Sequence, residues 1–170
     1  KLDAKSKIKA KNVTVTNYHG FAYSALIKQG ISTGIPELIQ TFNRTHPKIA
    51  TYDVLILDEY QDIELELAEM LKFIKASCPD IQIIAVGDME QKIYDKTTLH
   101  VPSFIDDFLG NYIRLEFTKC FRLSPELAKK LGRIWGKSII GTNENCIVEE
   151  MSLAEVTDFL STQKPKDVLC

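Results

Sequence analysis

Apolar residues in this chain fall into two patterns, short continuous runs and longer stretches with a helical repeat. Residues 52–57 and 81–86 are nearly unbroken apolar runs, which predict buried strands of a parallel sheet. Between them, residues 63–76 repeat apolar side chains at helical spacing, and Pro79 ends that stretch. This order predicts two parallel strands joined by a crossover helix.

The same alternation continues on both sides of these elements. We predict further strands over residues 12–16, 112–117, 146–148 and 167–170, and further helices over residues 18–28, 36–43, 103–109 and 153–160. The clearest helix start is Ser124-Pro125-Glu126, which offers a Ser N-cap, a Pro at the first helical position and an acid in the first turn. The predicted fold class is α/β, with a mostly parallel sheet and helices on both faces.

The composition is that of a globular protein. Hydrophobic residues make up 45% and charged residues 26% of the 170 residues, enough for one domain with a core, or for one domain plus part of another. Lys and Arg number 21 against 23 Asp and Glu, a net charge of −2, so no overall basic field indicates nucleic acid. A local groove can still be basic on an acidic protein. No apolar run approaches the ~20 residues of a membrane helix, so we expect a cytoplasmic protein without a membrane partner.

The cysteines give no sign of a metal site. Cys78, Cys120, Cys146 and Cys170 are scattered and form no CxxC pair, and the three histidines are dispersed as well. Structural zinc sites use closely spaced ligand pairs, so this spacing favours reduced thiols in a cytosolic protein.

Two acids directly follow the first buried strand, as Asp58-Glu59. In a phosphoryl-transfer site, an Asp at a strand end holds Mg²⁺, and a neighbouring Glu can polarise the attacking water. The alternative interpretation is a pair of solvated acids that cap the next helix, where the helix dipole favours negative charge.

The second buried strand ends in Gly87-Asp88, and Gln91 follows three residues later. A Gln side chain offers both a donor and an acceptor, so Gln91 could bind a γ-phosphate or its attacking water. The alternative is an ordinary turn between strand and helix, in which Gly87 supplies unusual backbone dihedrals.

Two further segments carry candidate binding groups. Arg122 follows the strand predicted at 112–117 and could bind a phosphate in bidentate fashion, or could be a plain surface residue. Asn17, Tyr18 and His19 lie between a predicted strand and a predicted helix, which suits contact with a nucleic-acid backbone and a stacked base. Packed side chains that close a turn are the alternative for these three.

Taken in order, these segments resemble the UvrD/Rep-like DNA helicases of superfamily 1. The family carries a TFHGLA-like segment, a DExQD Walker B motif, a GDxxQSIY segment and an LxxNYRS segment, in this order. The corresponding segments here are NYHGFA from Asn17, YDVLILDEYQD from Tyr52, IIAVGDMEQKIY from Ile83 and LEFTKCFR from Leu115. The resemblance spans residues 13–135 and implies a RecA-like fragment of a P-loop NTPase.

The resemblance also implies roles for single residues, with ATP and Mg²⁺ as cofactors. Asp58 would coordinate Mg²⁺ and Glu59 would be the catalytic base on water. Gln91 would sense the γ-phosphate and couple hydrolysis to movement, and Arg122 would contact the γ-phosphate from across the cleft. Asp62 has the character of a helix cap more than of a ligand.

The resemblance assigns a second group of residues to single-stranded DNA. Asn17, Tyr18 and His19 would lie along the DNA track, and Tyr94 would belong to the segment that couples hydrolysis to movement on DNA.

Two segments of such a helicase are absent from this sequence. It contains no GxxxxGK[ST] Walker A loop, which in the family precedes the TFH-like segment, and the arginine-finger segment would follow Cys170. We therefore expect an internal fragment, with residues 1–115 from the first RecA-like domain and residues 116–170 from the start of the second. The expected partners are single-stranded DNA and the rest of the helicase chain. The fragment alone would be inactive, and its cut sheet would expose an edge strand or a bare face.

Two other functions stay open. A degenerate, non-catalytic module that binds DNA or a protein partner is favoured by residues 95–98, Asp-Lys-Thr-Thr, where the family usually has a Trp-Arg pair. The short interval between His19 and Asp58, where relatives insert an accessory subdomain, favours it too. The presence of Asp58, Glu59, Gln91 and Arg122 at strand ends argues against a non-catalytic module. The third possibility is an ATPase that moves no nucleic acid.

Overall fold

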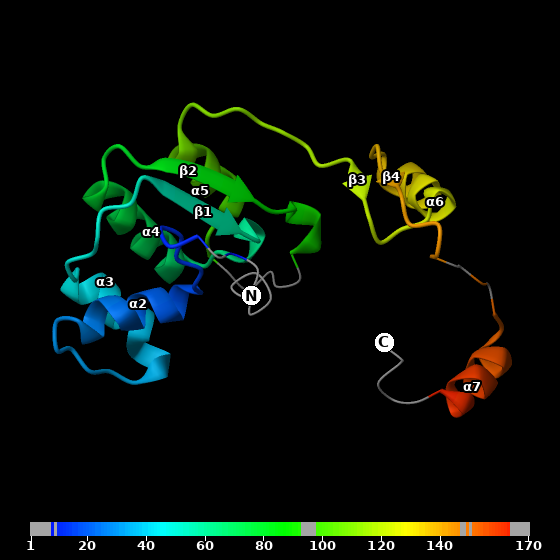
Figure 1. Ribbon diagram of the computed structural model, residues 1–170, viewed down its shortest axis with the longest axis horizontal. Coiled ribbons are helices and arrows are strands. Elements are labelled where there is room, and N and C mark those ends of the chain that lie inside the picture. The colour runs from blue at the N-terminus through cyan, green and yellow to red at the C-terminus, as the bar shows by residue number, and fades with distance from the viewer. Residues whose placement is uncertain (1–7, 9, 93–97, 147–148, 150, 164–170) are drawn as a thin grey trace. The chain divides into compact units, whose positions relative to one another are not determined.

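The computed structural model describes residues 8, 10–92, 98–146, 149 and 151–163 (Figure 1). Tyr94, the strand predicted at 167–170 and two of the three residues of the strand predicted at 146–148 lie outside these residues. The described residues form a mixed α/β structure. Contacts divide the chain into two compact units, Lys1–Tyr112 and Ile113–Cys170.

The first unit contains a parallel pair of strands. β1 (Val54–Asp58) pairs with β2 (Gln82–Val86), and the register places Leu55 opposite Ile83 and Leu57 opposite Ala85 (Figure 1). The helix α4 (Leu65–Ser77) connects the two strands, as parallel pairing requires. The predicted strand–helix–strand order is therefore confirmed.

The remaining helices of this unit include those predicted at 18–28, 36–43 and 103–109, and also two short helices, at 60–62 and 89–91, that were not predicted. They are α2 (Tyr18–Ile27), η1 (Ile35–Glu37), α3 (Leu38–Thr45), η2 (Tyr60–Asp62), η3 (Met89–Gln91) and α5 (Val101–Leu109). Pro102 stands in the first turn of α5, where its missing N–H costs no helical hydrogen bond.

One face of the sheet packs against the helices. Leu57 is buried in the core, and Leu55, Ile83 and Ala85 pack against it. The largest fully buried core side chains come from the helices and the segments beside them, namely Leu26, Phe42, Ile63, Met70, Leu71 and Val101. The Phe42 and Phe73 rings meet edge to face with centroids 5.6 Å apart, which joins α3 to α4.

The other face of the sheet is bare in the part of the chain that the structure describes. Side chains alternate across a strand, so Val54, Ile56 and Ile84 point away from the core. Ile56 is 64% exposed and Ile84 43% exposed. The prediction of helices on both faces is therefore wrong for the described residues, although the exposed apolar side chains are those of a face suited to burial.

Two predicted strands are not strands in the structure. Residues 12–16 and 112–117 form no ladder, because a strand exists only where a neighbour pairs with its backbone groups. The second segment keeps the alternation that misled the prediction, with Ile113, Leu115 and Phe117 exposed by 87%, 83% and 89%. Cys146, the one described residue of the strand predicted at 146–148, is not in a strand either.

The second unit contains a smaller parallel pair, β3 (Lys119–Cys120) with β4 (Ile140–Gly141), and the helices α6 (Pro125–Trp135) and α7 (Leu153–Thr162). The predicted cap of α6 is confirmed, because the Ser124 hydroxyl accepts from the Leu127 N–H at 3.2 Å. β4 was not predicted, and it runs close to the start of α6. A Cβ on Gly141 would lie 2.2 Å from the Ser124 carbonyl oxygen, so only glycine fits there.

In the ranges that the structure describes, none of the helices has the length and apolar character needed to span a bilayer.

Candidate functional site

The candidate site lies where β1 and β2 end. The register pairs Asp58 with Val86, so the chain leaves both strands at the same edge of the sheet. Asp58-Glu59 and Gly87-Asp88 consequently emerge as neighbours, at the carboxyl end of the strands where open α/β sheets bind their ligands.

Asp58 presents an exposed carboxylate at this edge, on the same side of β1 as Val54 and Ile56. Carboxylate oxygens are the ligands that Mg²⁺ prefers, and Mg²⁺ usually keeps several waters beside one or two protein carboxylates. A single exposed Asp therefore fits one position of a hydrated Mg²⁺ that is otherwise bound by phosphates. In the described part of the chain, this edge included, no three His, Cys, Asp or Glu side chains gather as a metal site.

Tyr18 at the start of α2 lies near the same edge. Burial, and then the carboxylates of Asp58 and Asp62, raise the pKa of its phenol above the ordinary value. The phenol therefore stays neutral at physiological pH and can donate a hydrogen bond. The charge of the predicted Mg²⁺ ligand thus acts on one residue of the predicted DNA track.

Glu59 turns the chain out of β1 in a left-handed conformation, with φ 57° and ψ 50°. An L-residue in this region costs about 1–2 kcal/mol, and such strain persists where the surroundings hold it in place. Glu59 thus stands at the N-cap position of η2 without a side-chain cap hydrogen bond. The expectation that Asp62 caps a helix is wrong, because it is the last residue of η2 and Glu64 precedes α4.

Gln61 joins the two strand ends, a role that was not predicted from the sequence. It is only 3% exposed. Its Nε2 donates to Glu59 Oε2 at 2.6 Å, and its Oε1 accepts from the Asp88 N–H at 3.1 Å. The only sequence signal was its place inside DEYQD, because a polar residue that is buried leaves no mark on an apolar pattern.

Gly87 lets the two strand ends approach this closely. A Cβ at this position would lie 2.5 Å from Gln61 Oε1 and 2.9 Å from the Tyr60 N atom. Gly87 is not among the described glycines with positive φ, which are Gly30, Gly110 and Gly136. The suggestion that Gly87 supplies unusual dihedrals is therefore wrong, and space is what the glycine provides.

Gln91 lies at the same edge, at the end of η3. Its Nε2 donates to Asp88 Oδ2 at 3.2 Å, while Asp88 Oδ1 accepts from the Glu90 N–H at 3.1 Å. The Asp88 carboxylate thus caps η3 and orients Gln91, a role that was not predicted from the sequence. The predicted base and the predicted phosphate sensor are consequently joined through Gln61 and Asp88.

The other residues predicted to contact DNA have local roles or lie elsewhere. Asn17 caps α2, since its Oδ1 accepts from the Gly20 N–H at 2.6 Å. His19 follows on the exposed first turn of α2. Tyr94 lies outside the described residues.

Arg122 belongs to the second unit, so the structure brings together the predicted site residues of the first unit alone. It is exposed in the turn between β3 and α6. Its backbone carbonyl accepts from Asn143 Nδ2 at 3.1 Å, which fixes this turn against the segment after β4.

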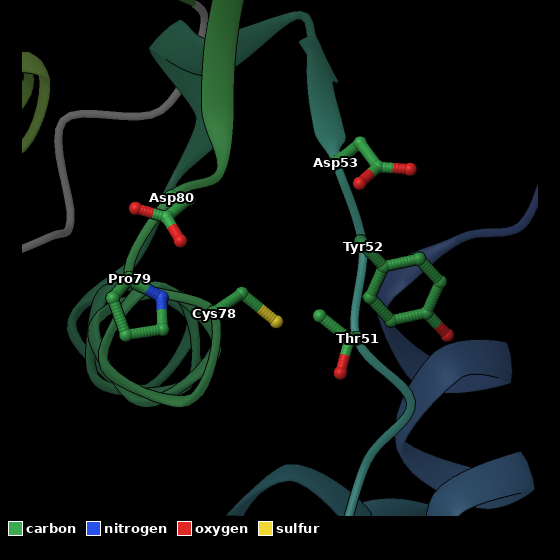
Figure 2. A pocket seen from close by; sticks show the side chains of 6 residues that line it. All are labelled: Thr51, Tyr52, Asp53, Cys78, Pro79 and Asp80. Atoms are coloured by element: carbon green, nitrogen blue, oxygen red, sulfur yellow. The ribbon is translucent and has the colours of Figure 1, made fainter.

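A small hollow opens at the opposite edge of the sheet, before β1 and β2 begin (Figure 2). Asp53 and Asp80 line it, but Figure 2 shows their carboxylates directed away from one another, and the Cys78 thiol faces Thr51 between them. These side chains do not converge on a common ligand. The strand ends at Asp58 and Val86 therefore remain the stronger candidate.

Comparisons with known proteins match the chain to a family model and to a curated protein. A family model described as AAA domain matches residues 6–97. Among curated proteins, the chain is similar to the RecBCD enzyme subunit RecB of Borreliella burgdorferi, with 26% identity over 113 residues. This match covers 66% of the chain but 9% of RecB, so the chain spans about a tenth of the length of the relative it matches.

Proposed function

Because this chain belongs to the AAA domain family, we propose that it is part of an ATP-dependent DNA helicase that moves along single-stranded DNA. The supporting observation is the meeting of Asp58-Glu59 with Gly87-Asp88 at one edge of a parallel sheet. The segments with predicted phosphate and metal chemistry in the first unit all reach this edge.

We assign the hydrolytic step to two acids and one amide. Asp58 holds Mg²⁺, which when bound neutralises charge on the ATP phosphates. Glu59 accepts a proton from the water that attacks the γ-phosphorus, and ADP leaves with the electrons of the broken P–O bond. Gln91 contacts the γ-phosphate and reports its presence.

The rest of the site is proposed to come from other parts of a longer protein. Residues 1–115 belong to the first RecA-like domain and residues 116–170 to the second, which supplies Arg122 to the γ-phosphate. A Walker A loop and an arginine-finger segment are expected outside these 170 residues. The chain by itself is therefore expected to show no ATPase activity, and DNA-stimulated turnover by the 170 residues alone would contradict this expectation.

DNA contact is proposed for Asn17, Tyr18, His19 and Tyr94. The helix start at Asn17 offers polar and aromatic groups of the kind that hold a phosphate backbone and stack on bases. Tyr18 also lies near Asp58, so a shift of the DNA-bound helix would be felt at the Mg²⁺ ligand.

The test of the hydrolytic site is Glu59→Gln in the full-length protein that contains this chain. The exchange keeps the shape of the side chain and removes the base, so ATP turnover should fall at least ~100-fold, as expected for the loss of a general base. ATP binding should remain within a few-fold of the wild type, as measured with a fluorescent analogue.

The matched control is Glu64→Gln, the same exchange at an exposed acid that makes no side-chain cap hydrogen bond. It should leave turnover unchanged. Full activity of Glu59→Gln would remove the basis of the proposed function, whereas ATP-independent DNA binding by an inactive wild type would favour the non-catalytic module.

A further inference from the structure

The buried amide of Gln61 joins the two halves of the candidate site. We propose that Gln61 is a positioning residue, which fixes the Glu59 carboxylate and links it to Asp88 and Gln91. The base and the phosphate sensor then respond to one another. This inference rests on the proposed function, because it assigns a purpose to the geometry around Glu59.

The chemistry of the contacts selects an amide at this position. The Glu59 carboxylate can only accept a hydrogen bond, and the Asp88 backbone N–H can only donate one. An amide carries a donor and an acceptor in one rigid plane and satisfies both groups at 2.6 Å and 3.1 Å. A carboxylate at this position would lose the donor, and a thioether would lose both contacts.

The surroundings hold Gln61 in this orientation. Its side chain is almost fully buried, so water does not readily replace either contact. The Gly87 backbone approaches Gln61 Oε1 and Tyr60 so closely that a Cβ there would overlap both, which closes that side of the amide. The contact with the charged Glu59 is of the stronger, charge-assisted kind.

The connection continues beyond Asp88. Its backbone N–H contacts Gln61, and its carboxylate accepts from Gln91 Nε2 at 3.2 Å. A displacement of Gln91 on phosphate binding or release would therefore move Asp88, then Gln61, and then the carboxylate of Glu59.

The contact itself is tested in the 170-residue chain by amide hydrogen exchange. Gln61→Met removes the acceptor for the Asp88 N–H, so exchange at Asp88 should rise about tenfold, the equivalent of one lost hydrogen bond. Gln61→Glu keeps an acceptor oxygen and should leave this amide protected. Unchanged exchange in Gln61→Met would show that the Asp88 contact does not exist in solution.

The matched control is Gln40, which makes the same type of contact in an exposed place. Its Nε2 donates to Glu66 Oε1 at 2.7 Å between α3 and α4. Gln40→Met should leave exchange at Asp88 and ATP turnover unchanged.

The positioning role is tested by ATP turnover of the full-length protein. Gln61→Met should lower kcat about 10- to 100-fold with KM for ATP changed less than about threefold, since a misplaced catalytic group costs rate more than binding. Wild-type kcat in Gln61→Met, together with an inactive Glu59→Gln, would overturn the positioning role and leave the proposed function intact. Turnover by Glu59→Gln would overturn both.

A pH profile separates positioning from general damage. In Gln61→Glu the introduced carboxyl lies against Glu59, with Asp58, Asp62 and Asp88 at the same edge, so repulsion raises its pKa. Once protonated, it can donate to Glu59 as the amide does. The kcat of this variant relative to wild type should therefore rise as pH falls from about 8 to about 6. A constant ratio across this range would overturn the role of the donor.

The link to Gln91 is tested by a double-mutant cycle in kcat. If Gln61 and Gln91 act through one connection, the double variant Gln61→Met/Gln91→Ala should be no slower than the slower single variant. If the fold-loss in kcat of the double variant equals the product of the two single losses, the two amides act independently.

Discussion

Single residues at the ends of β1 and β2 lie unusually close to residues of the neighbouring strand end. Gly87 has no space for a methyl group, and Glu59 has a left-handed backbone. These constraints come from contacts between segments that are distant in the chain. Packing at this edge is consequently sensitive to changes that would be harmless on a free surface.

Gly87→Ala is expected to destabilise the first unit by about 1–3 kcal/mol, because the added methyl group overlaps Gln61 and the Tyr60 backbone. Urea unfolding followed by far-ultraviolet circular dichroism measures the loss. Gly34→Ala is the control, since a Cβ there meets only Pro36 Cδ at 3.6 Å. Equal stability of both variants would mean that the strand ends are further apart in solution.

Tyr18 provides a probe of the charge at the site. Asp58→Asn should lower the pKa of the Tyr18 phenol, because it removes one of the carboxylates that raise it, while burial keeps part of the shift. Ultraviolet difference absorbance of wild type, Asp58→Asn and their Tyr18→Phe counterparts isolates this titration. Asp80→Asn, at the opposite edge of the sheet, should have no effect.

The same shift has a consequence for stability in alkaline solution. The folded pKa of Tyr18 lies above the unfolded value, so its contribution is complete below about pH 10. The contribution is lost as the pH rises through the folded pKa. Tyr18→Phe should therefore lose less stability than the wild type above about pH 10, and parallel curves for the two proteins would contradict the assignment.

Among the elements, α6 has the most explicit start signal in the sequence. Its N-cap, Pro at the first helical position and acidic first turn are all found in the structure. Each signal is local, so it acts wherever the rest of the chain lies.

Ser124→Ala should cost the second unit about 1 kcal/mol, the usual value for a lost N-cap. Trp135 is the sole tryptophan of the sequence and ends α6, so its fluorescence during urea unfolding reports on this unit. Ser138→Ala, an exposed serine after the helix, serves as the control. An unchanged urea midpoint for Ser124→Ala would show that the Ser124 cap does not stabilise the second unit.

The elements that could be predicted from the sequence are those marked by local residues or by a periodic pattern of apolar positions. The helices and the strands β1 and β2 follow from apolar runs and from Pro positions, which act within a few residues. The segments 12–16 and 112–117 have the same strand-like composition, but pairing depends on a neighbour that composition does not describe. β4 is two residues long and too short for any period.

The site was predictable to a similar extent. The carboxylates after β1 and the Gln after β2 could be placed at one edge, because parallel strands end together. The bridge through Gln61, the left-handed Glu59 and the orienting role of Asp88 could not, since they depend on contacts across the strand ends.

At the scale of the whole molecule, the chain is divided into two compact units between Tyr112 and Ile113. Residues 113–117 at this boundary belong to no described helix or strand, and Ile113, Leu115 and Phe117 are exposed. Exposed segments outside helices and strands are the preferred sites of proteolytic cleavage.

Limited digestion with chymotrypsin should therefore cut first near Tyr112, Leu115 or Phe117 and leave two fragments. Mass spectrometry identifies the sites, and circular dichroism tests whether the first fragment keeps its helices. Phe42 and Leu71 in the buried core are internal controls that should resist cleavage. First cuts within α3 or α4 would contradict the division into two units.

The parallel pairing of β1 with β2 also affects how the protein is made. Ribosomes add roughly 5–20 residues per second, and residues 59–82 must be added between the end of β1 and the start of β2, which takes about 1 to 5 s. Throughout that time the apolar run of β1 has been synthesised, but β2, the strand that pairs with it, has not. Slower elongation prolongs the time for which β1 is unpaired. The yield of folded protein should therefore depend on codon choice within residues 59–82 as well as on the free energy of folding.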